Sequence, residues 1–217
     1  MYKIKNFKVV YITLLIGLVL FCIVSFTVVT GKSKCIDNFV LLSFRNSGNT
    51  SIPIGPGWLL YFMQGVSAMG SVPVVAGITI LTSGILILKK KYISLRLILF
   101  AAIGGAIVEL LMKEFFSRPR PWIVPHLVSV ESLSYPSGHS AMSAIIYLSL
   151  VFLILPFEVK RSIKLFILYS ALFLILLIGI SRIYLGVHYP SDVLSGWALG
   201  LFWCSTSYIF AQNFKKY

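Results

Sequence analysis

The chain has 217 residues, of which 58% are hydrophobic and only 12% are charged. Soluble domains average about 45 to 50% apolar and about 25% charged residues, so this composition excludes an ordinary water-soluble domain and a disordered chain. The net charge of +13 comes in small basic groups between apolar runs, which argues against nucleic-acid binding and leaves an all-α integral membrane protein as the prediction.

The first predicted membrane span covers residues 9–29, a run without any charged residue. Its 21 residues, at about 1.5 Å each, reach about 31 Å, the thickness of the hydrocarbon core of a bilayer. Lys3, Lys5 and Lys8 precede it as in a secretory signal, but the apolar run exceeds the usual length of about 7 to 15 residues. We therefore expect a retained helix.

Five more apolar runs predict the remaining spans, at residues 69–88, 97–112, 140–156, 165–181 and 193–211. The uncharged stretch 46–88 is interpreted as a single crossing because Pro53 and Pro56 interrupt its first part. Trp58, Tyr61 and Phe62 are typical of an anchor at the headgroup level. The sequence predicts one membrane domain, residues 1–217, folded as a bundle of six transmembrane helices.

The distribution of basic residues predicts the orientation of this bundle. Six spans place both termini on one face, and 12 of the 19 Lys and Arg residues fall on that face. Because positive residues are enriched on the cytoplasmic side, both termini are predicted to be cytoplasmic. Two crossings within 46–88 would invert everything that follows.

With six spans, the third and fifth end on the outer face and the fourth and sixth begin there. Three polar segments occupy these ends: LMKEFFSRPRP at 111–121, SYPSGHS at 134–140 and SRIYLGVHYPSD at 181–192. Charged groups at membrane depth are costly, so their concentration at one face indicates a functional site. In their order and spacing the segments resemble the three signature motifs of the type 2 phosphatidic acid phosphatase superfamily, whose membrane members are six-span lipid phosphatases.

Residue chemistry across the three motifs predicts a phosphate site. Ser137 is a favoured N-cap, and Gly138 lets a ligand approach the positive end of a helix dipole. Arg120 and Arg182 can each bind two phosphate oxygens, and Lys113 adds a third cation. A phosphoryl group in transfer would thus be held from several sides.

The reacting groups come from the third motif and from His139 of the second. His188 and Asp192 are four residues apart, and Pro190 between them suits the first turn of a helix, so Asp192 can reach back to His188. The resemblance implies that His188 is the nucleophile that forms phosphohistidine, that Asp192 orients it, and that His139 is the general acid and later the base. No metal and no cofactor are expected, since Asp192 is the only acidic residue in this motif.

Three further residues carry weaker signals. Arg118, two residues from Arg120, is expected to make a headgroup or surface contact. Glu109 precedes Lys113 by four residues and is expected to pair with it. His126 lies outside every motif and is expected at the surface.

Two expectations concern structure alone. Gly196 and Gly200 form a pair of small residues suited to close helix packing. Cys22, Cys35 and Cys204 are expected to be unpaired, because their number and positions fit neither a disulfide framework nor a metal cage.

The sequence thus predicts a multi-pass lipid phosphatase of a bacterial plasma membrane with an extracytoplasmic active site. The resemblance implies three candidate substrates: undecaprenyl diphosphate, phosphatidylglycerol phosphate and phosphatidic acid. A phosphotransferase of the same fold is one alternative. A small transporter that uses Glu109, Lys113 and Asp192 is another, although these charges gather at one end of the spans instead of crossing the membrane. The oligomeric state is left open.

Overall fold

The computed structural model describes residues 7–154 and 160–213, and most of these residues are helical. The elements are α1 (Phe7–Val29), α2 (Lys34–Ser43), β1 (Arg45–Asn46), β2 (Asn49–Pro53), α3 (Gly57–Ala68), α4 (Val72–Leu88), α5 (Tyr92–Leu99), the π-helical turn η1 (Phe100–Gly104), α6 (Gly105–Phe116), α7 (Gly138–Ile154), α8 (Arg161–Tyr184) and α9 (Pro190–Asn213).

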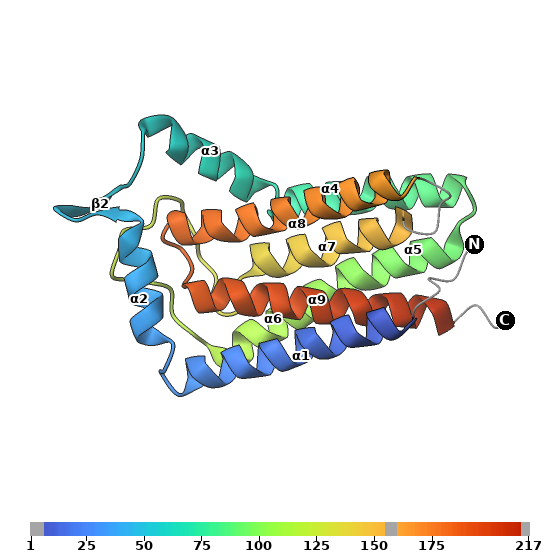
Figure 1. Ribbon diagram of the computed structural model, residues 1–217, viewed down its shortest axis with the longest axis horizontal. Helices are drawn as coiled ribbons and strands as arrows, with labels where there is room; N and C mark the ends of the chain where they lie inside the picture. Colours follow the sequence, from blue (N-terminus) through green and yellow to red (C-terminus); the bar gives the residue numbers. More distant parts are fainter. Residues whose placement is uncertain (1–6, 155–159, 214–217) are drawn as a thin grey trace.

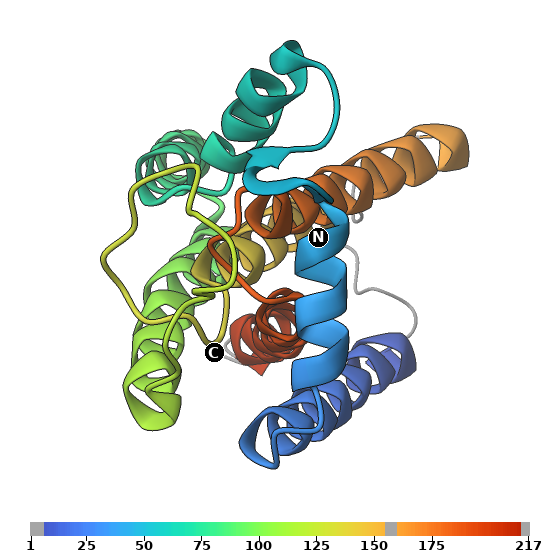
Figure 2. The same cartoon turned by 90° about the vertical axis from the view of Figure 1, so that its left-hand side faces the viewer.

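The long helices lie side by side as a bundle, and α1 begins at the end of the bundle where α9 ends (Figure 1). The opposite end faces the viewer in Figure 2. There α2, the short antiparallel pair of β1 and β2, and the connection from α6 to α7 cover the helix ends. One end of the bundle therefore carries a layer of polypeptide over the helix ends.

Four helical stretches are long and apolar enough to cross a membrane, namely Lys8–Val29, Tyr92–Phe116, Arg161–Tyr184 and Pro190–Asn213. The pair α3 and α4, bent by 44° at their junction, would add a fifth, and α7 is a shorter apolar helix. Each predicted span falls on a helix, although residues 155 and 156 lie outside the described residues. Large apolar side chains on the outside, such as Leu81 and Phe166 at 71% and 72% exposed, form the surface that lipid would contact.

Helix α7 lies at the centre and packs closely against α9 because both helices carry small residues there. A Cβ atom on Gly196 would lie 2.7 Å from the carbonyl oxygen of Ser137, and one on Gly200 would overlap the Cβ of Ala144. The expected close packing at Gly196 and Gly200 is therefore confirmed. Without a hydrophobic drive between helices in lipid, such close contact is a main source of stability.

Replacing Gly200 with leucine should destabilise the protein, because α7 and α9 must separate to admit the side chain. Overpacking costs about 1 to 3 kcal/mol, so a lower melting temperature in detergent is expected. Gly77→Leu is the matched control, since a Cβ on Gly77 would meet no other atom within 4 Å. Equal melting temperatures for the two variants would contradict this account of the packing.

Candidate active site

The candidate active site lies at the covered end of the bundle, where α6 and α8 end and α7 and α9 begin. Helix α9 starts at Pro190, as predicted, because a proline in the first turn loses no helical hydrogen bond. The backbone N–H of Ser137, directly before α7, donates to the carbonyl oxygen of Asp192 at 3.0 Å. This bond joins the second and third motifs.

His188 lies in the short connection between α8 and α9 and is 1% exposed. Its Nε2 is 3.2 Å from Nη1 of Arg120, and its Nδ1 is 3.5 Å from Oδ2 of Asp192. Because a guanidinium group can only donate, Nε2 must accept, and a neutral imidazole then carries its proton on Nδ1, toward the carboxylate. The expected approach of Asp192 to His188 is observed, but at 3.5 Å the carboxylate makes no hydrogen bond to Nδ1.

Asp192 is fully buried and accepts three hydrogen bonds that fix its carboxylate. Oδ1 accepts from Nη1 of Arg118 at 2.6 Å. Oδ2 accepts from Oγ of Ser134 at 2.5 Å and from the backbone N–H of Tyr189 at 2.8 Å. Ser134 was not predicted, because nothing in the sequence distinguishes it from the other serines nearby.

Two of the predicted phosphate-binding cations, Lys113 and Arg120, share Ser132 as a hydrogen-bond acceptor. The Ser132 hydroxyl accepts from Nζ of Lys113 at 3.2 Å and from Nη2 of Arg120 at 3.0 Å. Lys113 also donates to the carbonyl oxygen of Leu133 at 2.8 Å, and Arg120 donates to those of Ser132 and Val187, each at 2.6 Å. The connection before α7 thus gathers both cations beside His188.

The third predicted cation, Arg182, lies in the last turn of α8 and is 4% exposed. Its Nη1 donates to Oγ of Ser67 at 2.6 Å. Ser67 belongs to α3, so the extra helix before α4 helps to hold this guanidinium at the site.

The start of α7 carries the predicted residues Gly138 and His139. A Cβ on Gly138 would lie 2.5 Å from Oε1 of Glu109, so the group that comes closest to this glycine is the carboxylate of α6. Glu109 also pairs with Lys113 at 3.3 Å, which confirms the predicted pair. His139 lies in the first turn of α7, close enough to Arg182, Lys113 and Arg120 to interact with them electrostatically.

The prediction for Arg118 was wrong, because this side chain is not a surface contact. Only 16% of it is exposed, and it pairs with Asp192 and with Asp37 of α2, whose Oδ2 is 2.9 Å from Nη2. Asp37 had no motif to mark it. His126 is exposed, as predicted, and its Nε2 lies 2.7 Å from the carbonyl oxygen of Pro121.

Burial lowers the pKa of His188 well below the ordinary value of 6.5, and the charges of Arg120, Arg182 and Lys113 lower it further. The ring is therefore neutral at pH 6.5 and is protonated only in more acidic solution. We predict that the acid limb of kcat/KM, corrected for ionisation of the substrate, lies below pH 6.5 and moves to higher pH in Lys113→Met, which removes one cation. An acid limb above pH 6.5 in the unmodified protein would contradict this prediction.

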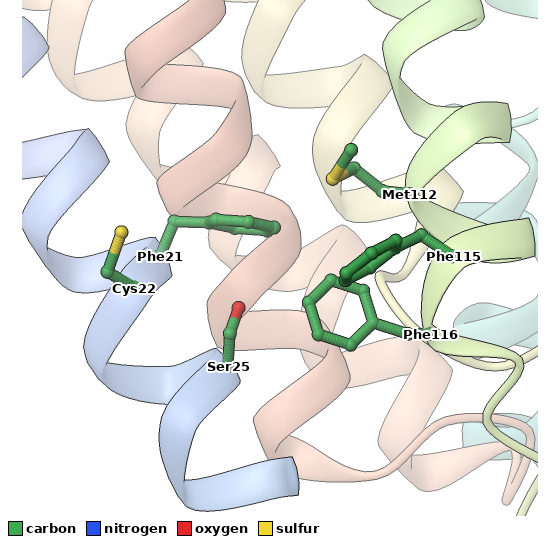
Figure 3. A pocket seen from close by; sticks show the side chains of 6 residues that line it. All are labelled: Phe21, Cys22, Ser25, Met112, Phe115 and Phe116. Carbon is green, nitrogen blue, oxygen red and sulfur yellow. The ribbon is translucent and has the colours of Figure 1, made fainter.

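An apolar hollow of about 350 Å³ lies between α1 and α6, lined by Phe21, Cys22, Ser25, Met112, Phe115 and Phe116 (Figure 3). None of the predicted site residues lines it. Tyr135 connects the hollow to the site. The Tyr135 hydroxyl is 2.7 Å from Oγ of Ser25, which lines the hollow, and the neighbouring residue Ser134 donates a hydrogen bond to Asp192. The hollow is a feature of the membrane-facing surface.

Cationic side chains gather at this site: Lys113, Arg120 and Arg182. In the described ranges 7–154 and 160–213, no three His, Cys, Asp or Glu side chains gather so that they could hold a metal ion. The three cysteines are free, as expected.

Comparison with known proteins identifies the family. Residues 94–216 match the family model described as the PAP2 superfamily. Phosphatidylglycerophosphatase B of Bacillus subtilis (strain 168) is 34% identical over 148 residues, which are 66% of this chain and 71% of that protein.

Two solved structures share the fold. One, described as the first transmembrane PAP2 type phosphatidylglycerolphosphate phosphatase from Bacillus subtilis, superposes with a TM-score of 0.71 at 25% identity and covers 95% of this chain and 96% of that chain. The other, Aquifex aeolicus LpxE, has a TM-score of 0.60 at 25% identity and covers 82% of this chain and 95% of that chain. The chain therefore belongs to the PAP2 superfamily, among its membrane-embedded phosphatases.

Proposed function

We propose that this PAP2 membrane lipid phosphatase hydrolyses a lipid phosphomonoester or diphosphate through a phosphohistidine at His188. The observation that carries the proposal is the position of the His188 ring, with Nε2 3.2 Å from Arg120 and Nδ1 3.5 Å from Asp192. One nitrogen faces a cation suited to phosphate, and the other faces a carboxylate that can orient the ring. This combination suits a nitrogen nucleophile that attacks a phosphoryl group.

The reaction has two halves. In the first, the Nε2 lone pair of His188 attacks phosphorus while the bond to the leaving oxygen of the lipid breaks, and protonated His139 gives its proton to that oxygen. In the second, water attacks phosphorus, neutral His139 accepts a proton from the water, and the bond between phosphorus and Nε2 breaks. Inorganic phosphate leaves, and both histidines return to their initial states.

Charge complementarity supports these steps without a metal ion. Lys113, Arg120 and Arg182 would face the phosphoryl oxygens, and the N-terminal end of the α7 dipole adds to their field. The negative charge of a bound phosphate would also favour the protonated form of His139, which the first half-reaction needs. We therefore propose metal-independent catalysis with no cofactor.

Phosphatidylglycerol phosphate is the substrate that we place first. The Bacillus subtilis relative and the solved structure with a TM-score of 0.71 both carry names that describe phosphatases of this lipid. Undecaprenyl diphosphate and phosphatidic acid come next. An apolar bundle would let any of these lipids present its phosphate to the site while its chains stay in the bilayer.

The proposed orientation is six spans with both termini cytoplasmic and the site at the extracytoplasmic face of a bacterial plasma membrane. One observation supports it: α1 begins and α9 ends at the same end of the bundle, away from the site (Figure 1). The sequence adds that six spans assign 12 of the 19 Lys and Arg residues to the face of the termini.

The purified protein should release phosphate from phosphatidylglycerol phosphate faster than from undecaprenyl diphosphate or phosphatidic acid. Release should persist with a chelator and stop with orthovanadate, which mimics the five-coordinate phosphoryl group. No release from any of the three lipids would contradict the proposal, and loss of activity with the chelator would indicate a metal-dependent route. Release in ¹⁸O-labelled water should place one label in each phosphate, whereas a phosphotransferase would pass the phosphoryl group to another acceptor.

A further inference from the structure

Asp37 is a buried acid that belongs to none of the three motifs. It lies in the first turn of α2, the helix that crosses the covered end of the bundle in Figure 2, and it is 1% exposed. Its Oδ1 accepts from the backbone N–H of Ser191 at 2.9 Å, and its Oδ2 accepts from the hydroxyl of Ser191 at 2.7 Å. Asp37 therefore caps the first turn of α9 from a separate helix, next to Asp192.

Arg118 bridges this carboxylate and that of Asp192. Nη2 donates to Oδ2 of Asp37 at 2.9 Å, and Nη1 donates to Oδ1 of Asp192 at 2.6 Å. Nη1 also reaches Oγ of Ser191 at 2.7 Å, and the guanidinium lies 4.2 Å from the ring centre of Tyr189. The planar group is thus fixed at both ends and on one face, a geometry that a lysine could not reproduce.

We propose that Asp37 is a positioning residue for the reaction, acting through Arg118 on the carboxylate of Asp192. This inference rests on the proposed function of His188. Arg118 satisfies Oδ1 of Asp192 and thereby leaves Oδ2 turned toward Nδ1 of His188. Without the charge of Asp37, one end of the guanidinium is released, so the carboxylate and the ring that it orients lose their fixed geometry.

The first test is Asp37→Asn, which removes the charge but keeps an oxygen that can accept from Ser191. By analogy with partners that orient metal ligands, whose loss costs about 10-fold to 100-fold in activity, kcat should fall about tenfold. KM should stay within about twofold, because substrate contacts are unchanged. An unchanged kcat would overturn the inference.

The second test is a double-mutant cycle with Arg118→Gln. Because Asp37 acts through Arg118, adding Asp37→Asn to Arg118→Gln should change kcat by less than about twofold. Losses that multiply would mean that Asp37 acts independently of Arg118 and would overturn the inference. If Asp37→Asn fails to fold, Asp37→Glu replaces it, because the longer side chain moves the carboxylate away from its position against Arg118. A lower kcat with unchanged KM then supports the inference, whereas an unchanged kcat overturns it.

Arg45→Gln is the matched control for loss of anchoring. Arg45 is 4% exposed and ties the segment after α2 to the bundle by donating to the carbonyl oxygen of Tyr184 at 2.8 Å. The kcat of Arg45→Gln should stay within about twofold of that of the unmodified protein. A tenfold loss in Arg45→Gln would mean that any lost anchor of this segment lowers kcat, and that Asp37 has no specific positioning role. If the unmodified protein releases phosphate and Asp37→Asn keeps full kcat, this inference alone is refuted. If the unmodified protein has no phosphatase activity, the proposed function is refuted as well.

Discussion

Replacing His188 with alanine should lower kcat for phosphate release by at least about 10⁴-fold, the scale seen when a catalytic nucleophile or its base is removed. The loss should be this large because, in the proposed reaction, Nε2 is the atom that forms the bond to phosphorus. The measurement is steady-state phosphate release in detergent micelles, together with size-exclusion profiles and melting temperatures to show that the variant is folded.

The two other histidines make this test specific. His126→Gln should keep activity within about threefold, because His126 is exposed and outside the site. His139→Ala should lose less activity on p-nitrophenyl phosphate than on a lipid, since nitrophenolate leaves without a proton, whereas His188→Ala should lose both activities equally. Substantial turnover by His188→Ala would refute the assignment of the nucleophile.

Replacing Arg120 with lysine should lower kcat by about 10² to 10³, comparable to the loss of a donor that stabilises developing negative charge. Lysine keeps the charge but loses the planar fork that reaches Ser132, Val187 and His188 at once. The ring of His188 would also lose the donor that makes Nε2 the acceptor, so the neutral imidazole could place its proton on the wrong nitrogen. Both effects lower kcat in the same direction.

Arg161→Lys provides the control for Arg120→Lys. Arg161 is exposed and begins α8 at the end of the bundle away from the site (Figure 1). Its kcat should be unchanged. If Arg120→Lys also retained full kcat, Arg120 would be a point charge and nothing more.

The sequence predicted those parts of the structure that depend on local pattern. Apolar runs marked the helices, Pro190 marked the start of α9, and spacing by four residues predicted the pair of Glu109 and Lys113. These features are encoded within one turn or one span. The three motifs likewise predicted which residues would meet. Successive spans run in opposite directions, so the end of one span and the start of the next lie on the same face.

Features that depend on the path of a connection were not predictable. Ser132 and Ser134 reach their partners only because of the path that the segment before α7 takes. Backbone acceptors such as the carbonyl oxygen of Val187 cannot be recognised in a sequence, because any residue type supplies one. Arg118 was assigned to the surface because its partner Asp37 lies 81 residues earlier, in a segment without a motif. The bend of 44° between α3 and α4 was missed for a similar reason. A run of uncharged residues predicts that a segment lies in lipid, but it does not predict the direction of the helix axis.

The hydroxyl of Ser132, which accepts from both Lys113 and Arg120, bears on discrimination among anions. Any anion that binds these two cations competes with an acceptor that the chain itself supplies. A singly charged ion such as chloride gains little by that exchange, whereas a doubly charged phosphate gains much more from the same two donors. An internal competitor of this kind raises the threshold for anion binding, so chloride and similar weak anions would be poor inhibitors of the enzyme.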